Sequence, residues 1–214
     1  MSRRRPPRLK RNIRPAVDAK PLLTVFCEGK NTEPDYLREF ARALGSGVVS
    51  VQLIKGAGVP RTLVEKAAEE KRKHARTMRR NSFAQADRFW VAFDCDEHPH
   101  LAEAMGLARD NNILVAYSNP CFEVWLLLHC DGVVVDGPID RHEAQTKLEA
   151  LLETYNAKVG KSPDFAELSG GYEHARAAAK TLRQRREEEG DPRGNPYTDF
   201  DFLTENIRTG CDPD

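Results

Sequence analysis

The sequence predicts an α/β fold: a mainly parallel central sheet of about four strands, flanked by helices and followed by a helical C-terminal extension. Two observations predict it. Short apolar runs typical of buried strands alternate with segments of helical spacing, and beyond about residue 140 only helical spacing continues. Such alternation indicates a parallel sheet, because parallel strands are joined by crossovers that usually contain a helix.

Four apolar runs have the length and the β-branched or aromatic content of buried strands. They cover residues 22–26, 48–54, 88–94 and 113–118. Because each is too short for an ordinary helix, we expect the four runs to share one sheet.

Helical spacing of apolar residues follows each predicted strand. In the segment 33–44, Tyr36, Leu37, Phe40 and Leu44 fall on one helical face. The other predicted helices cover residues 60–80, 100–111, 121–130, 142–157 and 171–189.

Composition divides the chain into a basic arm (1–20), an α/β core (21–135) and a helical C-terminal part (136–214) packed on the core. With 214 residues, of which 40% are hydrophobic and 31% charged, the chain can bury a core and is expected to be soluble. No apolar run approaches the roughly 20 residues of a membrane span, and the basic start lacks an apolar signal segment. Five scattered cysteines without a C-x-x-C pair indicate reduced thiols and a cytoplasmic location.

Basic residues are unevenly distributed although the net charge is zero. The arm has too little apolar content to bury surface and is predicted to be disordered when free. A second basic run lies within residues 71–80. Such clusters can neutralise nucleic-acid phosphates, or they can simply form solvated surfaces. Seven basic residues crowd the first 14 positions of the arm: Arg3, Arg4, Arg5, Arg8, Lys10, Arg11 and Arg14.

Carboxylates follow two of the predicted strands. Glu28 follows the first, and Asp94 and Asp96 follow the third. Because open parallel sheets bind ligands outside the carboxyl ends of their strands, these three side chains can converge. Converging carboxylates repel one another unless a cation lies among them, and hard oxygen ligands favour Mg²⁺ or Mn²⁺. The alternative for the Asp-x-Asp pair is an exposed acidic turn.

Candidate phosphate-binding residues follow the first and second predicted strands. Lys30 could contact a scissile phosphate as a point charge, or be an exposed loop lysine. Gly56 and Gly58, flanked by Lys55 and Arg61, precede a helix whose backbone amides suit an anion. The segment lacks the Lys and Ser/Thr of a Walker A loop, so we do not predict ATP binding. A flexible turn is the alternative.

A competing metal hypothesis uses Cys95, His98 and His100 as zinc ligands. Their spacing is usable, but no second cluster completes a tetrahedral set. The magnesium hypothesis is therefore favoured.

The Glu-Gly after the first strand and the Asp-x-Asp after the third resemble the Toprim domain of topoisomerases, primases and OLD-type nucleases. A closer similarity is to the RloB-like family, a Toprim-related group of bacterial defence and restriction loci. It covers most of the chain, from about residue 22 to about residue 207. The segments that carry it are FCEGKNTEPDYL, KGAGVPRTLVEKA, VAFDCDEH, AYSNPCFEVWLLLHC, GGYEHARAAAK and NPYTDFDFLTENI.

The resemblance implies roles for the acidic residues. By likeness to Toprim enzymes, Glu28 is a metal ligand and the proton-transfer group, and Asp94 and Asp96 hold Mg²⁺. Glu123, near the end of the fourth strand, could hold a second metal ion or an attacking water, or be a first-turn residue that the helix dipole favours. Asn119 could orient phosphate or the ion, or belong to a plain turn.

Two functions from different classes remain open. The first is a Mg²⁺-dependent endonuclease that cleaves RNA, with tRNA favoured, as the effector of an anti-phage abortive-infection system whose ABC/AAA-type ATPase partner is RloA. The second is a regulatory or adaptor module that binds a metal or nucleotide without cutting. All three acidic positions are kept, which favours the enzyme. The sequence leaves homo-oligomerisation and the choice between RNA and DNA open.

Overall fold

The computed structural model describes residues 20–77, 87–95, 100–135, 137–160 and 162–211. Within these ranges one sheet has the strand order β2-β1-β3-β4-β5. The first four strands are mutually parallel, and β5 runs antiparallel to β4. The strands are β1 (Leu22–Cys27), β2 (Ser50–Ile54), β3 (Arg88–Asp94), β4 (Leu114–Asn119) and β5 (Tyr197–Thr198).

Helices lie in most of the connections between these strands, and they also form most of the C-terminal part. They are α1 (Thr32–Ala43), α2 (Pro60–Thr77), α3 (Leu101–Asp110), α4 (Glu123–Leu127), α5 (Arg141–Leu151), α6 (Phe165–Ser169), α7 (Tyr172–Glu188) and α8 (Phe200–Thr209).

The prediction that four apolar runs share a mainly parallel sheet is confirmed. The expectation of no strand in the C-terminal part is wrong, because β5 pairs Thr198 with Ser118 of β4. A strand of two residues carries no periodicity of its own, and its pairing depends on tertiary context. The helix expected over 121–130 is shorter than predicted. The amides of Trp125, His129 and Cys130 each bond to the carbonyl three residues before, which tightens the turns around α4.

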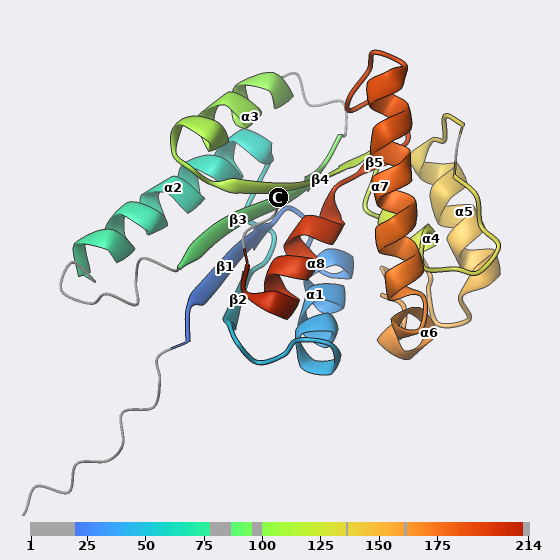
Figure 1. Cartoon of the computed structure of the whole chain (residues 1–214), viewed down its shortest axis with the longest axis horizontal. Helices are drawn as coiled ribbons and strands as arrows, with labels where there is room; N and C mark the ends of the chain where they lie inside the picture. The colour runs from blue at the N-terminus through green and yellow to red at the C-terminus, as the bar shows by residue number, and fades with distance from the viewer. Residues whose placement is uncertain (1–19, 78–86, 96–99, 136, 161, 212–214) are drawn as a thin grey trace, which may run out of the picture.

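Alternating side chains divide the core between the two faces of the sheet. Leu23, Val25 and Cys27 of β1 point to the face covered by α1 and α8, whereas Phe26 points to the face covered by α2 and α3 (Figure 1). Beyond β4, α7 contacts β5, and α4 contacts both α5 and α7. The C-terminal helices therefore complete the core on the α1 side of the sheet.

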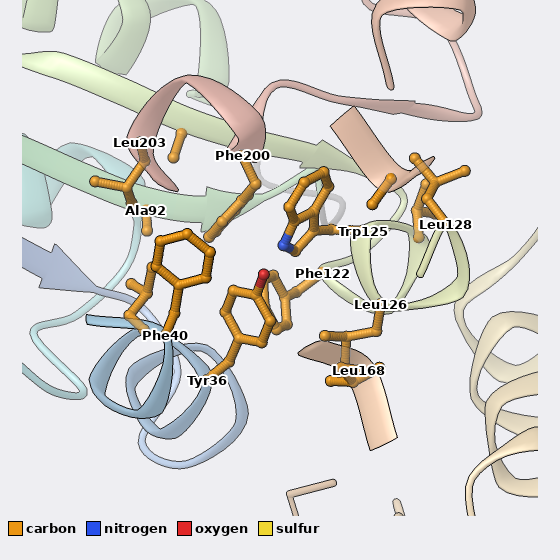
Figure 2. Packing of buried hydrophobic residues seen from close by; sticks show 14 of the residues in the cluster. Tyr36, Phe40, Ala92, Phe122, Trp125, Leu126, Leu128, Leu168, Phe200 and Leu203 are labelled. Atoms are coloured by element: carbon orange, nitrogen blue, oxygen red, sulfur yellow. The ribbon is translucent and has the colours of Figure 1, made fainter. Parts of the chain in front are cut away.

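An aromatic cluster joins α1, α4 and α8 (Figure 2). The ring of Phe122 lies 4.7 Å from that of Phe200 and 5.6 Å from that of Tyr36. Trp125 is fully buried in the same cluster. Helix α4 is apolar on nearly every side because it is buried on nearly every side. This packing fixes the start of α4 near the start of α1.

No helix in the described ranges is both long enough and apolar enough to cross a lipid bilayer.

Candidate active site

A cavity of about 280 Å³ lies beyond the carboxyl ends of β1 and β3. Segments distant in the sequence form it: the loop after β1, the last residue of β3, the N-terminal parts of α1, α4 and α5, and the segment 155–160 after α5. Its charged lining residues are Glu28, Lys30, Glu33, Asp94, Glu123 and Arg141. Four carboxylates therefore face one small cavity.

Glu28 and Asp94 are brought together, as their places after neighbouring strands predict. The amide of Glu28 donates to the carbonyl of Ala92 at 3.0 Å, which continues the ladder between β1 and β3. The amide of Asp94 donates to Oε2 of Glu28 at 3.3 Å. The Glu28 carboxylate is thus held beside the end of β3.

Asp94 is one of the buried acids of the cavity, with 9% of its side chain exposed. Its Oδ2 accepts from Nη2 of Arg141 at 3.0 Å, and its Oδ1 has no hydrogen-bond partner among the described residues. Burial raises the pKa of Asp94 well above its usual range, and the nearby carboxylates of Glu33, Glu123 and Glu28 raise it further. A buried carboxylate with an unsatisfied oxygen is costly unless a ligand completes it.

Glu33 is a fourth carboxylate that the sequence did not single out. It is the second residue of α1, its side chain is buried, and it faces the cavity. Burial raises its pKa to about 6, and Glu123 and Glu28 contribute in the same direction. The signal that could have identified it is position: the first turn of a helix lies close to the end of the strand before it.

Glu123, the first residue of α4, is held by two side chains from the C-terminal part. The Tyr155 hydroxyl donates to its Oε1 at 2.8 Å, and Nε2 of Gln145 donates to the same oxygen at 3.3 Å. Residues 145 and 155 thus help to build the site, so this part of the chain does more than cover the core.

Asp96 lies outside the described residues, so the predicted trio of Glu28, Asp94 and Asp96 is not fully visible. β3 ends at Asp94, although the amide of Cys95 still donates to the Ser118 carbonyl at 2.8 Å. In the described part of the chain, no three acidic, histidine or cysteine side chains are grouped closely enough to form a metal site. The carboxylates line one cavity without converging on one point.

The model of the family described as RloB-like protein matches residues 23–207. The chain belongs to the RloB-like protein family. This confirms the resemblance inferred from the sequence segments. Nothing among the curated proteins and nothing among the solved structures matches the chain. Every cavity residue lies inside the matched range, so the RloB-like segment contains the whole described site.

The candidate phosphate residues of the RloB-like chain fall into two groups. Lys30 lines the cavity, and its aliphatic stem passes over Gly56, where a β-carbon would lie 2.9 Å from Lys30 Cγ. Lys55 instead pairs with Asp35 at 2.8 Å.

The loop after β2 is not among the cavity-lining residues. Arg61 pairs with Glu65 and Glu103, each at 3.1 Å. The amide of Gly56 donates to the Gly29 carbonyl at 3.0 Å, and Gly58 has a φ of +120°, which favours glycine. The structure therefore does not bring Lys55, Gly58 or Arg61 to the carboxylates, and phosphate binding there stays a prediction.

Asn119, at the end of β4, donates from Nδ2 to the Arg193 carbonyl at 2.8 Å. This contact ties the loop before β5 to the end of β4. The proposed role of Asn119 in orienting phosphate or the metal ion stays a prediction.

The second basic run is partly used within the fold. Nζ of Lys71 donates to the carbonyls of Asn111 and Asn112, at 3.0 and 2.6 Å, just after α3. Lys73 pairs with Glu69 at 2.8 Å.

The proposed zinc ligand His100 pairs with Glu103 at 3.1 Å, and His98 lies outside the described residues. Among the described residues, no observation supports the zinc hypothesis.

Proposed function

We propose that this RloB-like chain is a Toprim-like, metal-dependent nuclease that hydrolyses phosphodiester bonds with Mg²⁺ or Mn²⁺. The observation that carries the proposal is Asp94: a buried carboxylate at the end of a central strand, with one oxygen unpartnered among the described residues, facing Glu28, Glu33 and Glu123.

The donor set fits a hard divalent cation. The four acidic residues that line the cavity offer carboxylate oxygens as ligands. Such oxygen ligands are preferred by Mg²⁺ and Mn²⁺, whereas softer metals prefer sulfur or nitrogen ligands. Glu28 and Asp94 would hold the ion together with Asp96. A bound divalent ion supplies Lewis-acid polarisation of a phosphate group.

The chain's own residues account for the remaining chemistry. Glu28 accepts a proton from the attacking water, since it faces the cavity and is held against the end of β3. Glu123, fixed by the Tyr155 hydroxyl, orients that water. Lys30 provides a point charge for a non-bridging phosphate oxygen at the cavity edge.

The biological setting that we propose is the one that the family resemblance implies. RNA, and tRNA in particular, is the favoured substrate over DNA. An ABC/AAA-type ATPase restrains the nuclease in the cytoplasm and releases it during phage infection, so that the chain acts as an abortive-infection effector.

A second candidate is a non-catalytic regulatory or adaptor module that binds a metal or a nucleotide in the same cavity. The ion pair between Arg141 and Asp94 favours it, because Arg141 already balances part of the negative charge. So does the absence of a ready-made group of three ligands in the ranges that the structure describes.

The two candidates are separated by incubating the purified chain with tRNA, single-stranded RNA and plasmid DNA, with Mg²⁺, Mn²⁺ or EDTA, and with and without the ATPase. The nuclease proposal expects cleavage that EDTA abolishes. Metal-dependent binding without cleavage in every combination would establish the adaptor.

A further inference from the structure

Arg141 is a cationic side chain that contacts the carboxylate cluster directly. It is the first residue of α5 and donates to Oδ2 of Asp94 at 3.0 Å. Its side chain remains 40% exposed at the cavity, whereas that of Asp94 is 9% exposed. The guanidinium therefore lies between a buried acid and the space from which a substrate would approach.

A side chain from the other end of the chain fixes the backbone just before Arg141. Asn195 Oδ1 accepts from the Ile139 amide at 3.0 Å, and Asn195 Nδ2 donates to the Ile139 carbonyl at 2.7 Å. The carbonyl of Asn195 accepts in turn from Nη1 of Arg186 at 3.1 Å. Ile139 is itself buried in the core. Asn195 thus holds both backbone groups of the residue two positions before Arg141.

We propose that Arg141 is a phosphate-binding residue with two positions, paired with Asp94 when the cavity lacks a divalent ion and turned to a phosphate oxygen of the nucleic acid when the ion is bound, and that Asn195 is its positioning residue. This inference rests on the proposed function, since it requires a divalent ion at Asp94.

Two cations cannot share Asp94 without repulsion. A divalent ion at its oxygens competes with the Arg141 guanidinium for the same charge, so metal binding weakens the ion pair. The guanidinium stays at the cavity mouth, because the backbone before it is fixed by Asn195. An arginine can bind a phosphate through two parallel N–H groups, which a lysine cannot do.

The test measures two affinities of the full-length chain: Mn²⁺ alone, and labelled tRNA with Ca²⁺ in place of Mg²⁺. Arg141→Gln should bind Mn²⁺ up to about tenfold more tightly, because a competing cation is removed, and should bind tRNA about tenfold more weakly. Arg141→Lys keeps the charge but loses the planar fork, so it should also weaken tRNA binding. In EDTA, where Arg141 pairs with Asp94, the variants should differ little from the parent chain.

Lys147→Gln is the matched control, since Lys147 lies on the same helix and pairs with Glu143 at 2.8 Å on an exposed face. It removes the same charge without touching Asp94, so it measures the general effect of charge. If Arg141→Gln does no more than Lys147→Gln, or weakens both affinities, the ion pair is only structural and the inference is wrong.

Asn195→Ala should shift both affinities in the direction of Arg141→Gln, and it should shift neither of them further in the Arg141→Gln background. Equal shifts in both backgrounds would assign Asn195 to general stability.

The Asp94→Asn variant distinguishes failure of the proposed function from failure of the Arg141 inference alone. If the parent chain and Asp94→Asn bind Mn²⁺ equally, the proposed function fails together with the inference. If only Asp94→Asn loses Mn²⁺ and the Arg141 variants are unchanged, the inference alone fails.

Discussion

The Glu33 carboxylate occupies the space that a side chain on Gly29 would need. A β-carbon added to Gly29 would lie 1.9 Å from Oε2 of Glu33. The backbone amide of Gly29 also stabilises the ionised form of Glu33 and so lowers its pKa, against the larger effect of burial. Glycine is therefore needed after Glu28 because the Glu33 carboxylate fills the space beside it, and not only because the chain turns there.

Gly29→Ala is predicted to destabilise the fold by about 1–3 kcal/mol, because the buried Glu33 carboxylate must move. In a Glu33→Ala background the same substitution should cost much less. Urea unfolding of the two single variants and the double variant measures this coupling.

Gly106→Ala is the control for that cycle. Gly106 lies in α3, and a β-carbon there meets nothing within 4 Å, so this variant should be slightly more stable than the parent chain. If Gly29→Ala is equally destabilising with and without Glu33, the backbone conformation of Gly29 is the cause instead.

Buried His129 predicts a loss of stability in mild acid. Its Nδ1 lies 2.9 Å from the Trp125 carbonyl and its Nε2 lies 3.0 Å from the Tyr36 hydroxyl, so the neutral ring satisfies both partners. Burial lowers its pKa from 6.5 to about 4. Between these values the unfolded chain binds a proton that the folded chain does not, so the folded state loses stability as pH falls from about 6.5 to 4. The full effect is on the order of 3 kcal/mol.

The buried acids act in the opposite direction, because burial raises the pKa of Asp199 to about 7 and that of Glu33 to about 6. The contribution of His129 is therefore read from the difference between the parent chain and His129→Gln, measured by urea unfolding from pH 8 to pH 4. The parent chain should lose its advantage over the variant as pH falls. A pH-independent difference would show that His129 contributes packing alone.

The sequence predicted the sheet well because buried parallel strands are continuous apolar runs. The same logic predicted that Glu28 and Asp94 share a cavity, since each follows a strand of one parallel sheet. In contrast, β5 has two residues, and its place depends on pairing with β4.

Glu33 and Arg141 were missed for different physical reasons. An acid in the first turn of a helix is favoured by the helix dipole in any case, so Glu33 carried no distinctive signal. Arg141 reaches Asp94 only because α5 packs against α4, and because Asn195 fixes the backbone before it. Contacts of that kind follow from tertiary packing, which periodicity and motif spacing do not encode.

The basic arm, which lies outside the described residues, is predicted to contribute affinity for nucleic acid rather than chemistry. Removing the residues before Lys20 should weaken tRNA binding and flatten its salt dependence by about one unit of slope for each lost phosphate contact. Titrations of labelled tRNA at several salt concentrations measure the slope. A full-length chain with the seven basic residues of positions 3–14 changed to glutamine separates charge from length. Unchanged slopes in both chains would assign the arm to solubility or to a protein partner.

Asp94→Asn and Glu28→Gln are predicted to abolish cleavage without unfolding the chain. Each substitution keeps the size of the side chain and removes a charge needed to hold the divalent ion, and Glu28→Gln also removes the proton acceptor. General acid–base catalysis is typically worth about 10²–10⁴-fold, and loss of the ion should cost at least as much. Because both substitutions relieve repulsion among the cavity carboxylates, the free energy of unfolding should be unchanged or slightly higher.

Asp110→Asn, an exposed substitution at the end of α3, is the matched control and should leave cleavage unchanged. In cells, phage protection should disappear with Asp94→Asn and with Glu28→Gln but survive the control. The adaptor makes a different prediction, because a module that only binds has no need of the Glu28 proton acceptor. If Glu28→Gln keeps both metal binding and phage protection, the cavity is a binding site and not a catalytic one.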